Sequence, residues 1–319
     1  HIRYIEEDIK LNQLLINIGD EINFSKITLL ASQGISHIKV YKKPKVVVFA
    51  SGEELKLHYE KIEDFQIYNS NTPTFISRIK ELGCGVTFIG QAKDSIESIK
   101  ELINNSLDAN LIITSGGVSV GDADFTKEAF NALDFETLFE GIDIKTSTFS
   151  LFSLQTKNKT CKNKNLKVYI EGDGLSWITR NTISKDPTPI NSTILNLMYE
   201  DKSECRVYLA RPCQFINAGS CDKKYWTSHR FSYEVIKSFD ESLSSLKKEY
   251  QNSNFTLIGH SGGGAVASLL ASSRNDVNMF ITIAGNLDTQ KWISMYNLSE
   301  LTGSLNPADF TKKLQNIKQ

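Results

Sequence analysis

Apolar residues in the first half of the chain gather in short runs that are separated by longer amphipathic stretches. The runs VVVFA (46–50), VTFIG (86–90) and LIITS (111–115) have the length and the β-branched content of buried strands. Residues 72–83 and 95–106 carry apolar side chains at helical spacing. This alternation predicts a parallel sheet with helices on both faces, where ligands bind beyond the carboxyl ends of the strands.

The pattern changes after Thr148. The runs FSLFSL (149–154) and LKVYIEG (166–172) flank a turn rich in lysine and asparagine, which predicts a hairpin. Strands then alternate with helical segments, including strands at 205–210, 255–259 and 278–285 and a long amphipathic helix at 231–250. Both halves are therefore predicted to be of the α/β class, as two three-layer units.

The composition narrows the class of protein without naming a function. A chain of 319 residues corresponds to two domains or one large one, at roughly 100–200 residues per domain. The net charge is -1 and the sequence has no basic stripe with interleaved aromatic residues, which argues against binding of nucleic acid. It also has no apolar run of roughly 18 residues, which argues against a membrane span. The chain opens on His1 without a methionine and reads as a window of a longer sequence.

Cysteine usage differs between the halves. Cys84 stands alone, whereas Cys161, Cys205, Cys213 and Cys221 all lie in the second half. Cys213 and Cys221 could close a small loop, which would suit an oxidising compartment. No CxxC or mixed histidine and cysteine spacing indicates a zinc site.

The loops after the first three strands, SGEEL, QAKDS and GGVSVGDAD, carry carboxylates and glycines. Gly116 and Gly117 allow close backbone approach to a ligand, and N–H groups ahead of the next helix favour an anion such as phosphate. A tight turn with Asp124 as a helix cap is the alternative. Glu54, Asp94 and Asp124 could converge where Mg²⁺ bridges a phosphate.

Three segments, ASGEEL (50–55), IYNSN (67–71) and TSGGVSVGDADFTK (114–127), resemble the molybdopterin-binding domain of molybdopterin molybdenumtransferase, the bacterial counterpart of the gephyrin E domain. The resemblance covers roughly residues 1–145. It implies insertion of molybdate into adenylylated molybdopterin with Mg²⁺, in the cytoplasm, and a possible homodimer through this half. Residues 1–43 would be the end of a preceding domain.

The same resemblance implies roles for individual residues. Those that match the phosphate-binding loop are Ser115, Gly116, Gly117, Ser119, Gly121 and Asp124. In the family, acidic residues serve the metal and molybdate chemistry, and the matching residues here are Glu54, Asp94 and Asp124.

The family pattern breaks after GIDIK (141–145). The family continues into a Pro-Gly-Lys-Pro segment and a small β-rich domain, whereas Thr146, Ser147 and Thr148 follow here. The amino-terminal part of the family fold is also missing. We therefore expect a molybdopterin-binding-like domain at 44–145 that does not complete the reaction alone, and a junction at 146–148.

The second half contains the pentapeptide GHSGG (259–263), which fits the GxSxG pattern of a nucleophilic serine at a strand-to-helix turn. Ser261 would be the nucleophile, with the N–H of Gly262 as one oxyanion donor. The EGDG loop, and Gly174 in it, would supply the other. A structural turn is the alternative. Residues 149–319 resemble bacterial α/β-hydrolases of the esterase and lipase kind, which implies ester hydrolysis through an acyl-serine without a cofactor, in the cytoplasm or the periplasm.

The partners that such a serine requires are incomplete. No histidine follows Ser261, although the family order is serine, acid, histidine. His260 is interpreted as a packing residue and His229 as a surface residue in the wrong chain order. Asp288 is a conceivable acid, whereas Asp309 is interpreted as a capping or surface residue. The acid and base are expected beyond the last residue, in a domain truncated at its carboxyl end.

Three functions remain open from the sequence. The first is molybdenum-cofactor biosynthesis through the first half, and the second is serine ester hydrolysis through the second. The third is a non-catalytic ligand-binding or assembly module. Because both family patterns are interrupted, we hypothesise a chimeric or mis-joined reading frame rather than an evolved bifunctional enzyme.

Overall fold

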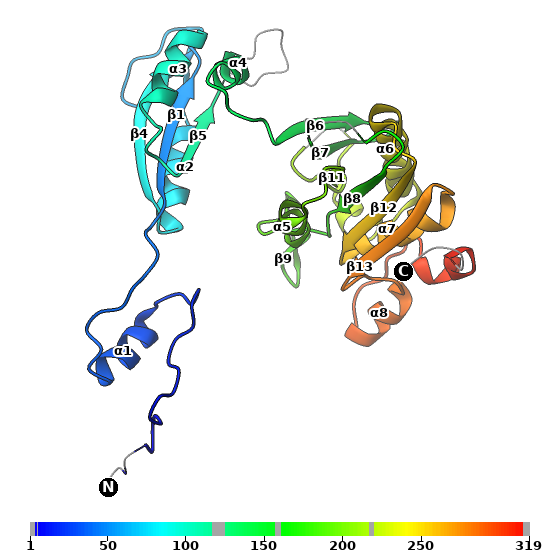
Figure 1. The fold of residues 1–319 in the computed structure, drawn as a ribbon. Coiled ribbons are helices and arrows are strands. Elements are labelled where there is room, and N and C mark those ends of the chain that lie inside the picture. Colours follow the sequence, from blue (N-terminus) through cyan, green and yellow to red (C-terminus); the bar gives the residue numbers. More distant parts are fainter. Residues whose placement is uncertain (1–3, 5, 117–124, 157–160, 217–219, 315–319) are drawn as a thin grey trace. The chain divides into compact units, whose positions relative to one another are not determined.

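The structure is a computed structural model that describes residues 4, 6–116, 125–156, 161–216 and 220–314. The chain forms two compact units, which comprise His1–Phe135 and Glu136–Gln319. Each unit contains its own sheet (Figure 1). None of the described helices is long and apolar enough to cross a membrane.

The first unit is built on a three-stranded parallel sheet in the order β4-β1-β5. Its strands are β1 (Lys45–Ser51), β4 (Gly85–Ala92) and β5 (Leu111–Ser115). The helices are α2 (Asn71–Glu81), α3 (Ile96–Asn104) and α4 (Phe125–Asn131). Every residue of β1 after Lys45 is buried, because one hydrophobic cluster packs on each face of this central strand. The predicted parallel α/β sheet is confirmed.

One cluster joins Phe49 to Ile99 and Ile103 of α3, and the other joins Val48 to Ile79 of α2. Alternate residues of a strand point to opposite faces, so a strand covered on both sides needs an unbroken apolar run. The short strands β2 (Leu55–Lys56) and β3 (Ile67–Tyr68) form a separate parallel pair.

The segment before β1 has little core of its own. Its helix α1 (Phe24–Ser32) buries only Leu30 among its described residues. Large apolar side chains on either side of this helix are exposed, among them Leu14, Ile18 and Tyr41. Such exposure is unusual for an independent fold.

The second unit is built on a six-stranded sheet in the order β13-β12-β8-β11-β7-β6. Its strands are β6 (Phe139–Lys145), β7 (Ser150–Thr156), β8 (Asn165–Ile170), β11 (Arg206–Leu209), β12 (Asn254–His260) and β13 (Val277–Ile283). The four strands β11, β8, β12 and β13 are mutually parallel, whereas β7 runs antiparallel to β11 and to β6.

One prediction about the start of this sheet is corrected. The predicted hairpin of 149–154 with 166–172 does not form, because β11 lies between β7 and β8. The hairpin is β6–β7, closed by Thr146, whose N–H and hydroxyl both donate to the carbonyl of Phe149 at 2.8 and 2.7 Å. Residues 146–148 are therefore the turn of this hairpin, and the unit boundary lies earlier, after Phe135.

Helices cover both faces of this sheet. They are α5 (Thr193–Glu200), α6 (Tyr233–Tyr250) and α7 (Gly262–Ser273), and a further helix, α8 (Thr289–Tyr296), follows β13. The main core joins α6 and α7 to the sheet, for example through Phe239, Leu243 and Val266. A smaller cluster joins Ile194 and Met198 of α5 to the opposite face. Short elements complete the unit, namely β9 (Trp177–Thr179), β10 (Thr182–Ile183), η1 (Lys223–Trp226) and η2 (Pro307–Leu314).

Two disulfide bonds lie in the second unit. Cys213 pairs with Cys221, as the spacing suggested, and Cys161 pairs with Cys205, which the sequence did not predict. Cys84 of the first unit is a free thiol. Disulfides persist mainly in oxidising compartments.

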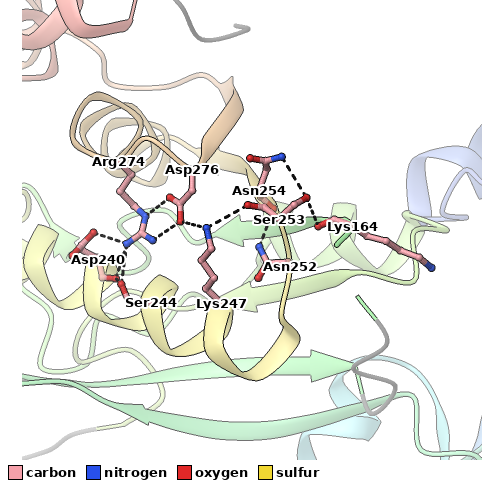
Figure 2. Close-up of polar contacts among 9 residues, drawn as sticks. All are labelled: Lys164, Asp240, Ser244, Lys247, Asn252, Ser253, Asn254, Arg274 and Asp276. Carbon is pink, nitrogen blue, oxygen red and sulfur yellow. Dashed lines mark hydrogen bonds and ion pairs between the residues drawn. The ribbon is translucent and has the colours of Figure 1, made fainter. Parts of the chain in front are cut away.

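A network of charges fastens the ends of α6 and α7 to the start of β13 (Figure 2). The carboxylate of Asp276 accepts hydrogen bonds from Nε and a terminal nitrogen of Arg274, both at 2.8 Å, and from Nζ of Lys247 at 2.7 Å. Arg274 also pairs with Asp240 at 2.6 Å. Burial raises the pKa of Asp276, but the hydrogen bonds from the two cations outweigh it and hold the pKa below its ordinary value.

Asp276→Asn is expected to lower the free energy of unfolding by about 1–3 kcal/mol at pH 7, because hydrogen bonds to charged groups contribute roughly that much. The stabilisation by a carboxylate with a lowered pKa is present above its unfolded pKa of about 3.9 and is lost as the pH falls through the folded pKa. The difference from wild type should therefore shrink at pH 3. Urea unfolding at both pH values measures it, with the exposed Asp143→Asn as the control. An equal difference at both pH values would contradict the assignment.

Candidate functional sites

Ser261 lies in the turn between β12 and α7 with φ 51° and ψ -119°. This backbone conformation is unfavourable for a residue with a side chain, so the surrounding structure must hold it. Its N–H donates to the carbonyl of Ile283 at 2.9 Å, and its carbonyl accepts from the N–H groups of Gly264 at 3.0 Å and Asn286 at 3.2 Å. A strained serine between strand and helix is the context that the GxSxG pattern requires.

The flanking glycines allow backbones to touch. A Cβ atom at Gly259 would lie 2.2 Å from the carbonyl oxygen of Gly263. A Cβ at Gly263 would lie 2.3 Å from the carbonyl oxygen of Ile170 at the end of β8. Both distances are far below van der Waals contact, so strand β12, helix α7 and strand β8 can meet this closely only through glycine.

The EGDG loop (171–174) follows β8 and lies against this turn. A Cβ at Gly172 would lie 3.7 Å from Cβ of Ser261 and 3.3 Å from Nδ1 of His260. Gly174 has a φ of +61°, and a Cβ there would lie 2.0 Å from the carbonyl oxygen of Pro187. The loop therefore borders the serine, as an oxyanion loop must, while the assignment of Gly262 and Gly174 as donors stays a prediction.

A pocket of about 230 Å³ opens at this edge of the sheet. It is lined by the EGDG loop, Leu175, residues 189–191, His260 and Ser261. The pocket lies beyond the carboxyl ends of β8 and β12, where ligands of parallel sheets bind. It brings together the predicted nucleophile and the predicted oxyanion loop.

A buried carboxylate, Glu171, and a partly buried one, Asp173, hold the EGDG loop. Glu171 accepts hydrogen bonds from its neighbour Gly172 N–H and from the Tyr208 hydroxyl, both at 2.8 Å, and from the Ser192 hydroxyl. Burial and the Glu171 charge together raise the pKa of Tyr208, so the phenol remains a hydrogen-bond donor. The carboxylate of Asp173 pairs with Arg211 at 3.2 Å and with Arg230 at 3.0 Å.

The two arginines and Gln214 were missed by the sequence reasoning. Arg211 directly follows the strand run CRVYLA, so its place at the carboxyl end of a strand was a usable signal. Arg230 offers none, because 57 residues separate it from Asp173. Gln214 donates to the carbonyl of Gly172 at 3.0 Å and accepts from the N–H of Arg211 at 3.0 Å.

The described residues place no histidine in hydrogen bond with the Ser261 hydroxyl. His260 borders the pocket, whereas the ring of His229 lies over Gly303, with Nδ1 2.8 Å from the Ser228 hydroxyl. Asp288, the conceivable acid, caps α8 and accepts from the N–H of Lys291 at 3.0 Å. Asp309 lies in η2. The base of Ser261 therefore stays unassigned among the described residues.

In the first unit, four buried hydroxyls at the carboxyl edge of the sheet have no hydrogen-bond partner among the described residues. They belong to the ends of β1 and β5 and the first turn of α4, namely Ser51, Thr114, Ser115 and Thr126. Gly116 has a φ of +95°, and a Cβ there would lie 1.9 Å from the carbonyl oxygen of Ser51. Unpartnered buried hydroxyls are costly, and a bound anion would satisfy them. Gly117, Ser119, Gly121 and Asp124 lie outside the described residues.

The predicted magnesium ligands are only partly described. The Glu54 carboxylate lies over Gly52, and the Asp94 carboxylate accepts from the N–H of Glu53 at 3.4 Å. Both carboxylates therefore border the same turn after β1. Among the described residues no three histidine, cysteine or acidic side chains form a metal-binding group. Two carboxylates would be a sparse site for Mg²⁺, so the ion stays a prediction that depends on Asp124.

The sequence matches two family models. Residues 47–200 match a probable molybdopterin binding domain, and residues 196–279 match lipase (class 3). The first match extends past Phe135 into the second unit, whereas the second contains the GHSGG turn.

The curated relatives are molybdopterin molybdenumtransferases. Molybdopterin molybdenumtransferase of Staphylococcus aureus is 34% identical over 140 residues, which are 44% of this chain and 33% of that protein. The Haemophilus influenzae enzyme is 39% identical over 128 residues, or 40% and 32% of the two chains. The chain spans about a third of the length of these curated relatives.

Two solved structures of different kinds are also similar to parts of this chain. A molybdopterin biosynthesis protein of Pyrococcus horikoshii is 28% identical with a TM-score of 0.36, covering 47% of this chain and 37% of that one. A Pyrococcus furiosus esterase is 12% identical with a TM-score of 0.37, covering 59% and 69%.

Proposed function

We propose that the chain joins part of a molybdopterin molybdenumtransferase to part of a serine ester hydrolase. The strained backbone of Ser261, held by three glycine-mediated contacts beside a pocket, carries the proposal for the second unit. The unpartnered hydroxyls beside Gly116 support an anion site in the first. The similarity of the two halves to different kinds of enzyme supports their different origins.

In the second unit Ser261 would attack the acyl carbon of an ester. Its hydroxyl proton must pass to a base while the C–O bond to the alcohol breaks, and water then hydrolyses the acyl-serine. The N–H groups of Gly262 and Gly174 would stabilise the oxyanion. No histidine among the described residues is hydrogen-bonded to the Ser261 hydroxyl, so the proposal assigns the nucleophile of this reaction and leaves its base unassigned.

A fluorophosphonate probe tests this assignment on the full chain. We expect weak or no labelling in neutral buffer without added base, and faster labelling when imidazole is supplied as an external base. Ser261→Ala is the control and should remove the imidazole-dependent label. Labelling that persists in this variant would exclude Ser261 as the nucleophile.

In the first unit the loop from Ser115 to Asp124 would bind the phosphate of molybdopterin, and molybdate would be the second substrate. Glu54, Asp94 and Asp124 would hold Mg²⁺, which supplies positive charge between phosphate oxygens. The unit corresponds to a third of the relatives, so we propose ligand binding without completed transfer, in the cytoplasm and possibly as a homodimer. Co-elution of molybdopterin with the full chain tests it, and no co-elution would count against it.

Different origins of the two units would account for the distribution of cysteines between them. Both disulfides lie in the second unit, which would suit a periplasmic hydrolase, and the free Cys84 lies in the first. Resequencing the parent gene across codons 130–150 tests whether the two halves were joined into one reading frame artificially. One uninterrupted native frame would contradict it. A chain that folds cooperatively but neither binds molybdopterin nor labels at Ser261 would instead support a non-catalytic module.

A further inference from the structure

Asp173 forms an unusual contact with the residue that follows the nucleophile. A Cβ atom at Gly262 would lie 2.3 Å from Oδ1 and 2.6 Å from Oδ2 of Asp173. The carboxylate therefore lies directly on the first residue of α7. Gly259 and Gly263 accommodate the meeting of the backbones, whereas the glycine at 262 is required by this one side chain.

The carboxylate is held from its other side by two arginines. Their side chains are nearly buried, with exposed fractions of 5% for Arg211 and 10% for Arg230. Each arginine is itself fixed, because Arg211 donates to the carbonyl of Arg230, and Nε of Arg230 donates to the carbonyl of Thr227 at 2.9 Å. The carboxylate thus has a single position, between two guanidinium groups and the first turn of α7.

This arrangement ties three segments together at the pocket. Asp173 belongs to the EGDG loop, Arg211 follows β11, and Arg230 precedes α6. Gln214 adds a second tie between the Arg211 backbone and Gly172. Because two guanidinium groups pair with this one carboxylate, its negative charge beside Gly262 is compensated.

We propose that Asp173, clamped by Arg211 and Arg230, is a positioning residue that locks the EGDG loop onto the first turn of α7 and so sets the oxyanion donors for Ser261. This proposal rests on the proposed ester hydrolysis. Asp173 acts through the backbone of Gly262 and of its own loop, and takes no part in bond making.

The test compares Asp173→Asn with Asp276→Asn in the full chain. Both replace a carboxylate that two cationic side chains hold, but Asp276 precedes β13 at the opposite end of the parallel strands from Ser261. With a fluorophosphonate probe and imidazole, Asp173→Asn should label Ser261 at least about tenfold more slowly than wild type. The labelling rate of Asp276→Asn should stay within about twofold of the wild-type rate, even if both variants unfold at similarly lowered temperatures. Equal labelling rates in the two variants would overturn the proposal.

Hydrogen exchange provides a readout that does not depend on the nucleophile. In Asp173→Asn the amides of residues 171–176 and 261–264 should exchange faster than in wild type, and in Asp276→Asn they should not change. If the wild-type chain is not labelled even with imidazole, the proposed ester hydrolysis is wrong. Hydrogen exchange still tests whether Asp173 holds the EGDG loop against α7. Unchanged exchange in Asp173→Asn would refute the clamp whatever the labelling shows.

Discussion

Gly263→Ala is expected to destabilise the second unit by about 3 kcal/mol, at the upper end of the usual cost of overpacking. In most helices this substitution would stabilise by up to about 1 kcal/mol, because alanine has the higher helix propensity. Here the added Cβ would lie 2.3 Å from the carbonyl oxygen of Ile170 and 2.6 Å from that of Glu171. Neither is the end of a flexible side chain, so α7 must move away from β8.

That movement would also open the site. The carbonyls that collide belong to the end of β8 and the start of the EGDG loop, so the loop should leave Ser261 and imidazole-dependent labelling should disappear. Thermal unfolding and probe labelling of the same sample measure both effects. Gly85→Ala is the control, because its Cβ would lie 3.7 Å from the nearest atom, at ordinary contact. A Gly263→Ala variant as stable as wild type would contradict the described approach of α7 and β8.

Gly116→Ala is expected to remove ligand binding by the first unit and to destabilise it by about 2–3 kcal/mol. The left-handed backbone at φ +95° costs about 1–2 kcal/mol for a residue with a Cβ. The Cβ would also lie 1.9 Å from the carbonyl oxygen of Ser51, so the loop after β5 must leave the end of β1.

Gly83→Ala is the matched control for this variant. Gly83 has a φ of +74° and nothing within 4 Å of its Cβ position, so the substitution adds the backbone strain without the collision. It should cost only the strain of about 1–2 kcal/mol and leave molybdopterin co-elution intact. If the two variants lose the same stability and binding, the close approach of Gly116 to Ser51 has no functional importance.

The sequence predicted those features that depend on neighbouring residues. The run LIITS became β5 with the same bounds, and VVVFA became the core of β1. The GHSGG turn followed from a strand run, three glycines and a small-residue helix that are contiguous in the chain. Such signals survive folding because burial of a strand and the steric freedom of glycine are local properties.

Features that join distant segments could not be predicted in this way. The partner of β7 is β6 rather than β8, because a short turn favours that hairpin and β11 then occupies the space beside β8. The meeting of Asp173 with Arg230 and the pairing of Cys161 with Cys205 depend on the finished sheet. Glycine at 262 was visible in the sequence, but its reason, the Asp173 carboxylate, was not.

The rate of fluorophosphonate labelling at Ser261, measured against imidazole concentration on the full chain and located by peptide mass spectrometry, tests the account most directly. If the turn holds the nucleophile but lacks its base, labelling should be slow in neutral buffer and the labelling rate should rise with imidazole concentration. The label should be found on the Ser261 peptide alone. Rapid labelling without imidazole would mean that a base is present after all. No labelling at any imidazole concentration would mean that the turn is structural and that the second unit is not a serine hydrolase.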